Sequence, residues 1–218
     1  MAAHYTELFL SAFVTLFVVI DPAGCAPIFA SLTGDTPAAH RRAMAIRSVM
    51  VGGGILLVFA LFGEVLLGTL GISLDAFRVA GGIMLFLIAL EMVFEQRTRR
   101  REQRADEISQ RGRGNAGDGP VLEDISVFPI GIPMIAGPGA IATVMLLMAR
   151  SRTGAETGIV LAALAGALLL TLLALLAAAP LMRLAGRRIE AMVTRVLGVI
   201  LAALAAQFVI DGLKAGFS

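Results

Sequence analysis

The chain has 218 residues, of which 58% are hydrophobic and only 16% charged, and its mean hydropathy is +0.88. A soluble domain carries about 25% charged residues, so this composition excludes an ordinary cytosolic, secreted or nucleic-acid-binding protein. The apolar residues gather in six runs of about 20, the length that crosses a hydrocarbon layer about 30 Å thick. The sequence therefore predicts an all-α, polytopic membrane protein with six transmembrane helices.

Three of the predicted spans lie in the first part of the chain. They cover about residues 6–32, 48–70 and 76–94. The first contains the segment Asp21–Pro27, in which two prolines and one glycine fall within seven residues. Proline removes a backbone donor and glycine permits unusual backbone angles, so we interpret this segment as a break in helix 1 rather than a simple kink.

A polar segment, residues 96–120, follows the third span. It is rich in Arg, Glu and Gly and nearly free of large apolar side chains. Such a composition buries too little surface to offset its ordering entropy, so we expect a disordered or partly helical cytoplasmic linker. Its arginines are interleaved with acidic residues and no aromatic side chain accompanies them, so we expect no nucleic-acid binding.

The remaining spans cover about residues 121–148, 157–182 and 192–213. The fourth span is interrupted by prolines and glycines, at Pro129, Pro133 and Gly137–Gly139. Backbone groups freed inside a bilayer are tolerated only where protein or water satisfies them. The pattern therefore predicts that helix 4 is broken, like helix 1, and that both breaks face the interior of the protein.

The two halves of the chain resemble each other. The breaks at Pro22 and Pro138 lie 116 residues apart, and the similar strings Arg78–Ile83 and Arg195–Ile200 lie 117 apart. Each half has three spans, an odd number, so the copies must be inverted relative to one another, as in many secondary transporters. We therefore predict two inverted three-helix repeats. They would cover residues 1–95 and 121–218, with the linker 96–120 between them.

Positive charges are divided unequally between the two sides of the predicted bundle. The connections between spans 1 and 2, 3 and 4, and 5 and 6 hold fourteen of the eighteen Lys and Arg residues. Cations are retained on the cytoplasmic side of a membrane. We therefore predict a multi-pass protein of the cell inner membrane, with the linker in the cytoplasm and both termini in the periplasm.

Asp21 most needs an explanation, because it lies deep within an apolar span. A charged side chain at the bilayer centre costs about 2.5–3.5 kcal/mol on insertion scales. Asp21 could bind a substrate ammonium group or a coupling cation, or it could carry a proton. Equally, it could cap the helix that restarts at Pro22, since Asp followed by Pro is a typical helix start.

Other candidate chemistry is sparse. The hydroxyls of Thr143 and Ser31 lie near the breaks and could contact a substrate or bond to carbonyls of their own helices. The sequence has one cysteine, no His-Glu-x-x-His motif and no phosphate-binding Gly-x4-Gly-Lys loop. We therefore expect no enzyme activity, no catalytic residues, no metal site and no cofactor.

Four strings resemble the motifs of the MarC family of integral membrane proteins, namely Val19–Phe29, Phe77–Ile83, Phe128–Gly139 and Gly198–Gly212. Relatives in this family include small neutral amino-acid transporters. The family fold pairs two inverted three-helix repeats with broken first and fourth helices. The resemblance implies substrate contacts at Asp21, Pro22, Gly24, Pro27, Gly137, Pro138, Gly139 and Thr143.

We therefore expect a secondary transporter of small neutral amino acids or similar metabolites in a bacterial inner membrane. Its partners would be the lipid bilayer, a small substrate, and a coupling proton or sodium ion. The alternative is a non-transporting membrane scaffold or regulatory protein, in which the breaks serve only helix packing. Transport predicts a polar cavity that reaches Asp21, whereas a scaffold predicts a closed apolar bundle.

Overall fold

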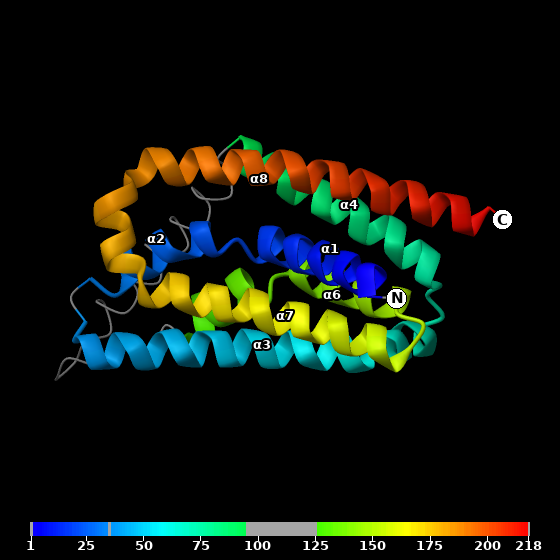
Figure 1. Cartoon of the computed structure of the whole chain (residues 1–218), viewed down its shortest axis with the longest axis horizontal. Helices are drawn as coiled ribbons and strands as arrows, with labels where there is room; N and C mark the ends of the chain where they lie inside the picture. Colours follow the sequence, from blue (N-terminus) through cyan, green and yellow to red (C-terminus); the bar gives the residue numbers. More distant parts are fainter. Residues whose placement is uncertain (1, 35, 95–125, 218) are drawn as a thin grey trace.

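The computed structural model describes residues 2–34, 36–94 and 126–217, which form a bundle of helices with no strand among them (Figure 1). Five stretches of helix are long and apolar enough to cross a membrane. A shorter apolar helix, α6, follows the π-helix η1. The all-α, polytopic fold is therefore confirmed. The elements are α1 (Ala2–Ile20), α2 (Pro22–Leu32), α3 (Ala38–Thr69), α4 (Leu74–Val93), η1 (Ser126–Ile135), α6 (Pro138–Arg150), α7 (Gly154–Leu176) and α8 (Ala178–Gly216).

Corresponding spans of the two halves run in opposite directions. Figure 1 shows α1 and α6 pointing opposite ways, and the same holds for α3 with α7 and for α4 with α8. Both chain ends lie at one end of the bundle, which we call the N/C end, together with the α3–α4 and α6–α7 connections. The directions match the inverted repeats that the sequence predicts. The linker 96–120 lies outside the described residues.

Helices α4 and α8 pack closely along their length. A Cβ atom added to Gly82 would lie 2.9 Å from the carbonyl oxygen of Ala205, and one added to Gly212 would lie 3.0 Å from that of Asp75. Small residues let two helix backbones approach when lipid supplies no hydrophobic driving force. Gly82 and Gly212 are therefore packing residues. They let α4 and α8 approach closely as an antiparallel pair.

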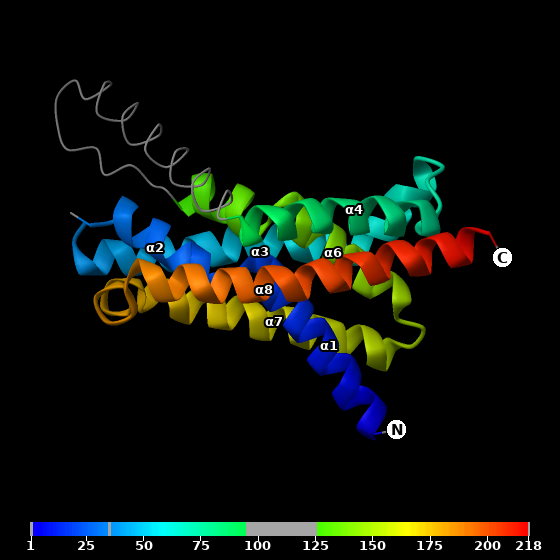
Figure 2. The ribbon, with the colours of Figure 1, turned by 90° about the horizontal axis from the view of Figure 1, so that it is seen from above.

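The broken span formed by α1 and α2 lies deepest in the bundle. In its most apolar stretch 56% of the residues are buried, against 22–33% in the other four long spans. The exposed large apolar side chains of α3, α4, α7 and α8 then face outward, as lipid requires. Figure 2 shows α1 inclined to the other helices, with its N-terminal end standing away from them. The first break is thus central in the molecule.

Several predicted boundaries were wrong. Helix α3 begins at Ala38, ten residues before the predicted span, and its 32 residues exceed the length that crosses the hydrocarbon layer. The predicted fifth span ends early, at Leu176, and the loop expected near residues 183–191 lies inside the 39-residue helix α8. Basic residues suit an aqueous interface in a helix as well as in a loop, so charge alone did not distinguish the two.

Candidate functional site

The first break is a single residue, Asp21, between α1 and α2. Its φ of 58° and ψ of 66° are left-handed, and it is the one non-glycine residue with positive φ in the part of the chain that the structure describes. Its carboxylate Oδ1 accepts the Gly24 N–H at 3.1 Å, an N-cap with Pro22 at the first helical position. Asp21 is only 1% exposed. The capping interpretation of Asp21 is therefore confirmed.

The break is narrower than predicted. The Asp21 N–H still donates to the Phe17 carbonyl at 3.0 Å, and the Cys25 N–H donates to the Asp21 carbonyl at 3.0 Å. Residues 22–32 are helical, so the expected unwinding as far as Pro27 was wrong. Pro27 lies inside α2 and has no N–H to donate to the carbonyl four residues earlier, at Ala23.

The second break lies between η1 and α6. Residues 126–135 form a π-helix, which retains backbone hydrogen bonding through Pro129 and Pro133, and its last bond joins the Ala136 N–H to the Gly131 carbonyl at 3.0 Å. Gly137 is extended, with φ −67° and ψ 163°, and α6 starts at Pro138 without a side-chain cap. Non-helical backbone is thus confined to Ala136 and Gly137, and Pro129 and Pro133 do not interrupt the helix.

The two breaks lie side by side. A Cβ atom added to Gly139, at the start of α6, would lie 3.5 Å from Val19 Cγ1, 3.4 Å from Leu85 Cδ2 and 2.4 Å from Ile88 Cδ1. Val19 is two residues before Asp21, so the start of α6 packs directly against the end of α1. This contact agrees with the expectation that both breaks face the interior of the protein.

One hydroxyl near the breaks lacks a partner. Thr143 lies one turn beyond Gly139 and therefore on the same side of α6. It is 0% exposed, and its Oγ1 has no hydrogen-bond partner among the described residues. Ser31 is exposed and donates to the Ile28 carbonyl at 2.8 Å, so its hydroxyl is used within α2. A buried unpaired hydroxyl is costly, which makes Thr143 the stronger candidate for contact with a guest molecule.

The predicted site residues thus gather around two adjacent helix starts. Pro22 and Gly24 are buried beside Asp21, and Pro27 and Gly137 are half-buried. Gly24 has to be small, because a Cβ atom there would lie 2.3 Å from Asp21 Oδ2. Pro138 is exposed in the isolated chain, whereas Gly139 is buried. In the described part of the chain no group of acidic, His and Cys residues could hold a metal ion.

The N/C end carries a polar network that sequence analysis did not identify. The Arg150 guanidinium, at the end of α6, donates to Asp211 Oδ2 at 2.6 Å, and the Gln207 amide donates to Asp211 Oδ1 at 2.6 Å. The Arg150 guanidinium also lies 4.7 Å from the centre of the Phe208 ring. The i, i+4 spacing of Gln207 and Asp211 was visible in the sequence, but nothing in it brings Arg150 to them.

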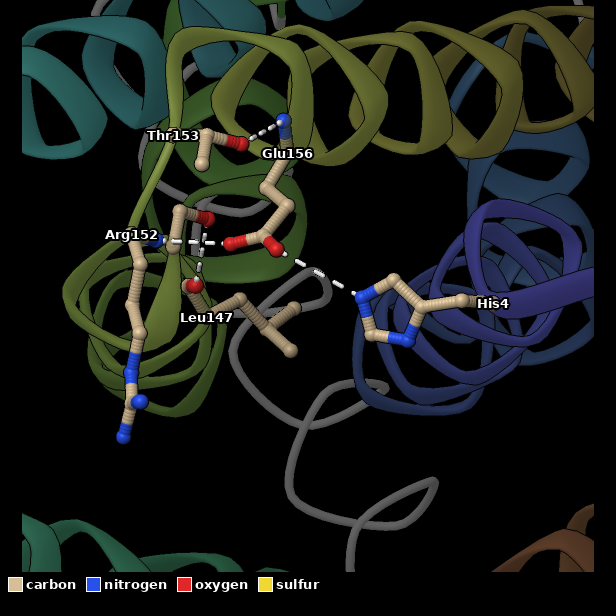
Figure 3. Close-up of polar contacts among 6 residues, drawn as sticks. His4, Leu147, Arg152, Thr153 and Glu156 are labelled. Atoms are coloured by element: carbon tan, nitrogen blue, oxygen red, sulfur yellow. Dashed lines mark hydrogen bonds and ion pairs between the residues drawn. The ribbon is translucent and has the colours of Figure 1, made fainter. Parts of the chain in front are cut away.

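A second polar contact at this end joins α1 to α7. Figure 3 shows His4 Nε2 facing Glu156 Oε1 at 3.4 Å, while Glu156 Oε2 accepts the Arg152 N–H at 2.7 Å. Thr153 caps α7 by accepting the Glu156 N–H at 3.2 Å. Glu156 therefore fixes the start of α7 and meets the first turn of α1.

Comparison with known proteins places the whole chain in one group. The family model described as MarC family integral membrane protein matches residues 6–217. A UPF0056 membrane protein of Methanocaldococcus jannaschii is 35% identical, over 95% of this chain and 97% of the relative. The UPF0056 inner membrane protein YhgN of Escherichia coli is 32% identical over 94% and 95%, and YvbG of Bacillus subtilis is 35% identical over 94% and 93%. No solved structure matches the chain significantly.

Proposed function

Because the chain belongs to the MarC family of integral membrane proteins, we propose that its buried helix breaks bind a transported solute. The proposed activity is secondary transport of small neutral amino acids or similar metabolites. Polar groups deep in a bilayer are costly, and they commonly mark substrate or ion pathways. The breaks of this chain concentrate such groups at one place.

The adjacency of the two breaks, with the unpaired Thr143 hydroxyl beside them, is the observation that carries the proposal. Helix α6 starts against the end of α1, beside the break after which α2 starts. Helix starts present N–H groups and partial positive charge to a carboxylate. The Asp21 carboxylate presents an acceptor to an ammonium group. This combination suits a zwitterion without net charge.

Asp21 and Thr143 are almost completely buried, so the proposed site is closed in this conformation. A transporter must pass through a closed state between openings to either side. A scaffold would remain closed. A transporter therefore differs from a scaffold in whether Asp21 and Thr143 become accessible from outside the protein. An experiment has to measure that accessibility.

The remaining parts of the proposal concern location and energy source. The E. coli relative is named an inner membrane protein, and we propose the same location for this chain. A proton or sodium gradient would drive transport, since the sequence has no nucleotide-binding loop. The proposal includes no enzymatic step, no cofactor and no nucleic-acid partner.

Uptake into proteoliposomes tests the proposal. Purified protein would be supplied with a panel of labelled neutral amino acids, with and without a proton or sodium gradient. We expect saturable uptake of at least one of them and weaker uptake by a Thr143→Val variant. No uptake above empty liposomes for any solute and gradient would leave the scaffold function as the better explanation.

The orientation in the membrane is tested separately. A cysteine placed at Asn115 in a Cys25→Ala background would lie in the linker, which we place in the cytoplasm because of the distribution of cations. We expect an impermeant thiol reagent added to intact cells to leave it unlabelled. Labelling from outside would reverse the orientation without affecting the transport proposal.

A further inference from the structure

Helix α6 is joined to the rest of its span only through the two non-helical residues Ala136 and Gly137. Its 13 residues make a rod of about 20 Å, with the second break at one end and the N/C end of the bundle at the other. Between these ends it packs on glycines, because Met145 lies against Gly63 of α3 and Leu146 against Gly81 of α4. Its other end continues into α7 through residues 151–153, so the rod can turn about its junction if its Arg150 end is released from α8.

The Arg150 end of α6 is tied to α8 by charge. Arg150 and Gln207 engage the two carboxylate oxygens of Asp211, both at 2.6 Å, so the carboxylate is held from two helices. The Arg150 and Asp211 side chains are 37% and 33% exposed, so the pair is not sealed inside the bundle. A half-exposed pair is weak enough to break reversibly, unlike a buried one.

A second cation opposes this tie. Arg78 of α4 is close enough to Arg150 for the two positive charges to repel each other. Arg78 itself pairs with Asp75, on its own helix, at 3.2 Å.

We propose that the Arg150–Asp211 ion pair is a latch that holds the end of α6 against α8 and closes the buried centre from the N/C end. With the pair broken, α6 turns about Ala136 and Gly137, and water reaches Thr143 from that end. The latch gives the proposed transport cycle one of its two gates, but it is a property of the conformation and does not depend on which solute binds.

Thiol labelling tests the latch without any substrate, so failure to find uptake and failure of the latch remain distinguishable. The reporter is Thr143→Cys in a Cys25→Ala background, in sealed vesicles whose orientation is read from a tag at the C-terminus. An impermeant maleimide is added on the N/C side. We expect Arg150→Gln and Asp211→Asn each to speed labelling about fivefold. This is the change in the ratio of open to closed protein expected when a partly exposed ion pair is lost.

The double variant Arg150→Gln/Asp211→Asn should label no faster than either single variant, because both remove the same interaction. The matched control is His4→Gln, which removes a different polar contact at this end, between α1 and α7, and labelling should stay unchanged. Ala140→Cys, another buried position on α6, serves as the reporter if Thr143→Cys does not fold. Unchanged labelling in the single variants, equal acceleration from both sides of the membrane, or a multiplied rate in the double variant would overturn the latch.

Discussion

The two breaks occupy equivalent places in the two halves but satisfy their backbones differently. At the first, the Asp21 carboxylate accepts the Gly24 N–H, so the chain closes its own helix start. At the second, the residue before α6 is Gly137, which brings no side chain. The first turn of a helix has N–H groups without intrahelical acceptors. The start of α6 therefore depends on its surroundings, whereas the start of α2 supplies its own partner.

This difference also explains two residues that differ between the halves. Gly24 and Ala140 are 116 positions apart, like Asp21 and Gly137. A Cβ atom at Gly24 would lie 2.3 Å from the Asp21 carboxylate, but beside Gly137 no carboxylate is present and Ala140 fits. In the geometry of this cap, the Asp21 carboxylate thus requires glycine at position 24. The two positions of each break form a coupled pair.

The largest effect is expected at Asp21. Asp21→Ala removes the cap and leaves alanine in a left-handed conformation, so we expect a loss of about 2–3 kcal/mol of stability. Asp21→Asn keeps a side-chain oxygen and a residue that tolerates this conformation, so its loss should be well under half as large. Thermal unfolding of the detergent-solubilised variants measures the difference.

Uptake by the same variants separates capping from chemistry. If Asp21 only caps α2, Asp21→Asn should retain most transport and Asp21→Ala should lose it. If a proton is coupled through this carboxylate, Asp21→Asn should remove the pH dependence of uptake. Uptake like that of the wild type in both variants would exclude Asp21 from the mechanism.

The next effect tests the coupled pair directly. Gly24→Ala should cost about 1–2 kcal/mol, because the new methyl group displaces the capping carboxylate. In an Asp21→Gly background, which reproduces the arrangement of Gly137 and Ala140, the same change should cost less than about 0.5 kcal/mol. Equal melting-temperature losses in the two backgrounds would show that the carboxylate does not decide which residue fits at position 24.

Sequence reasoning identified the breaks but not their extent. Proline and glycine clusters correctly marked where each span is interrupted, because these residues cannot continue an α-helix without cost. They did not show that one capping residue is enough at Asp21, or that a π-helix absorbs Pro129 and Pro133. Those outcomes depend on hydrogen bonds that only the folded backbone reveals.

The polar network at the N/C end shows a second limit. Arg150 and Asp211 are 61 residues apart and belong to different helices, and hydropathy places both simply near the ends of spans. Their pairing follows from the packing of α6 and α8. Periodicity and charge counts carry no such information, so charged residues near the ends of spans are read as topology signals before their contacts are known.

A smaller effect is expected where the two breaks touch. Gly139→Ala would place a methyl group 2.4 Å from Ile88 Cδ1, the far end of a flexible side chain. We expect a loss of about 1 kcal/mol, less than for Gly24→Ala, because Ile88 can move. Ile88→Val in the same chain should restore most of the melting temperature. A loss that Ile88→Val does not recover would place the strain at Val19 or in the backbone instead.

The smallest effect on stability, and the clearest on function, is expected at Thr143. Thr143→Val removes a buried hydroxyl that has no partner among the described residues, so stability should change by less than about 0.5 kcal/mol or even rise. The matched control is Thr171→Val. Thr171 is equally buried, but its hydroxyl donates to the Ala167 carbonyl at 2.8 Å, so its replacement should cost about 0.5–1 kcal/mol.

Uptake should show the reverse order, with a loss in Thr143→Val and none in Thr171→Val, because only Thr143 lies beside the breaks. If Thr143→Val instead destabilises the protein as much as the control and leaves uptake intact, its hydroxyl serves the fold, and the second break loses its best candidate for solute contact.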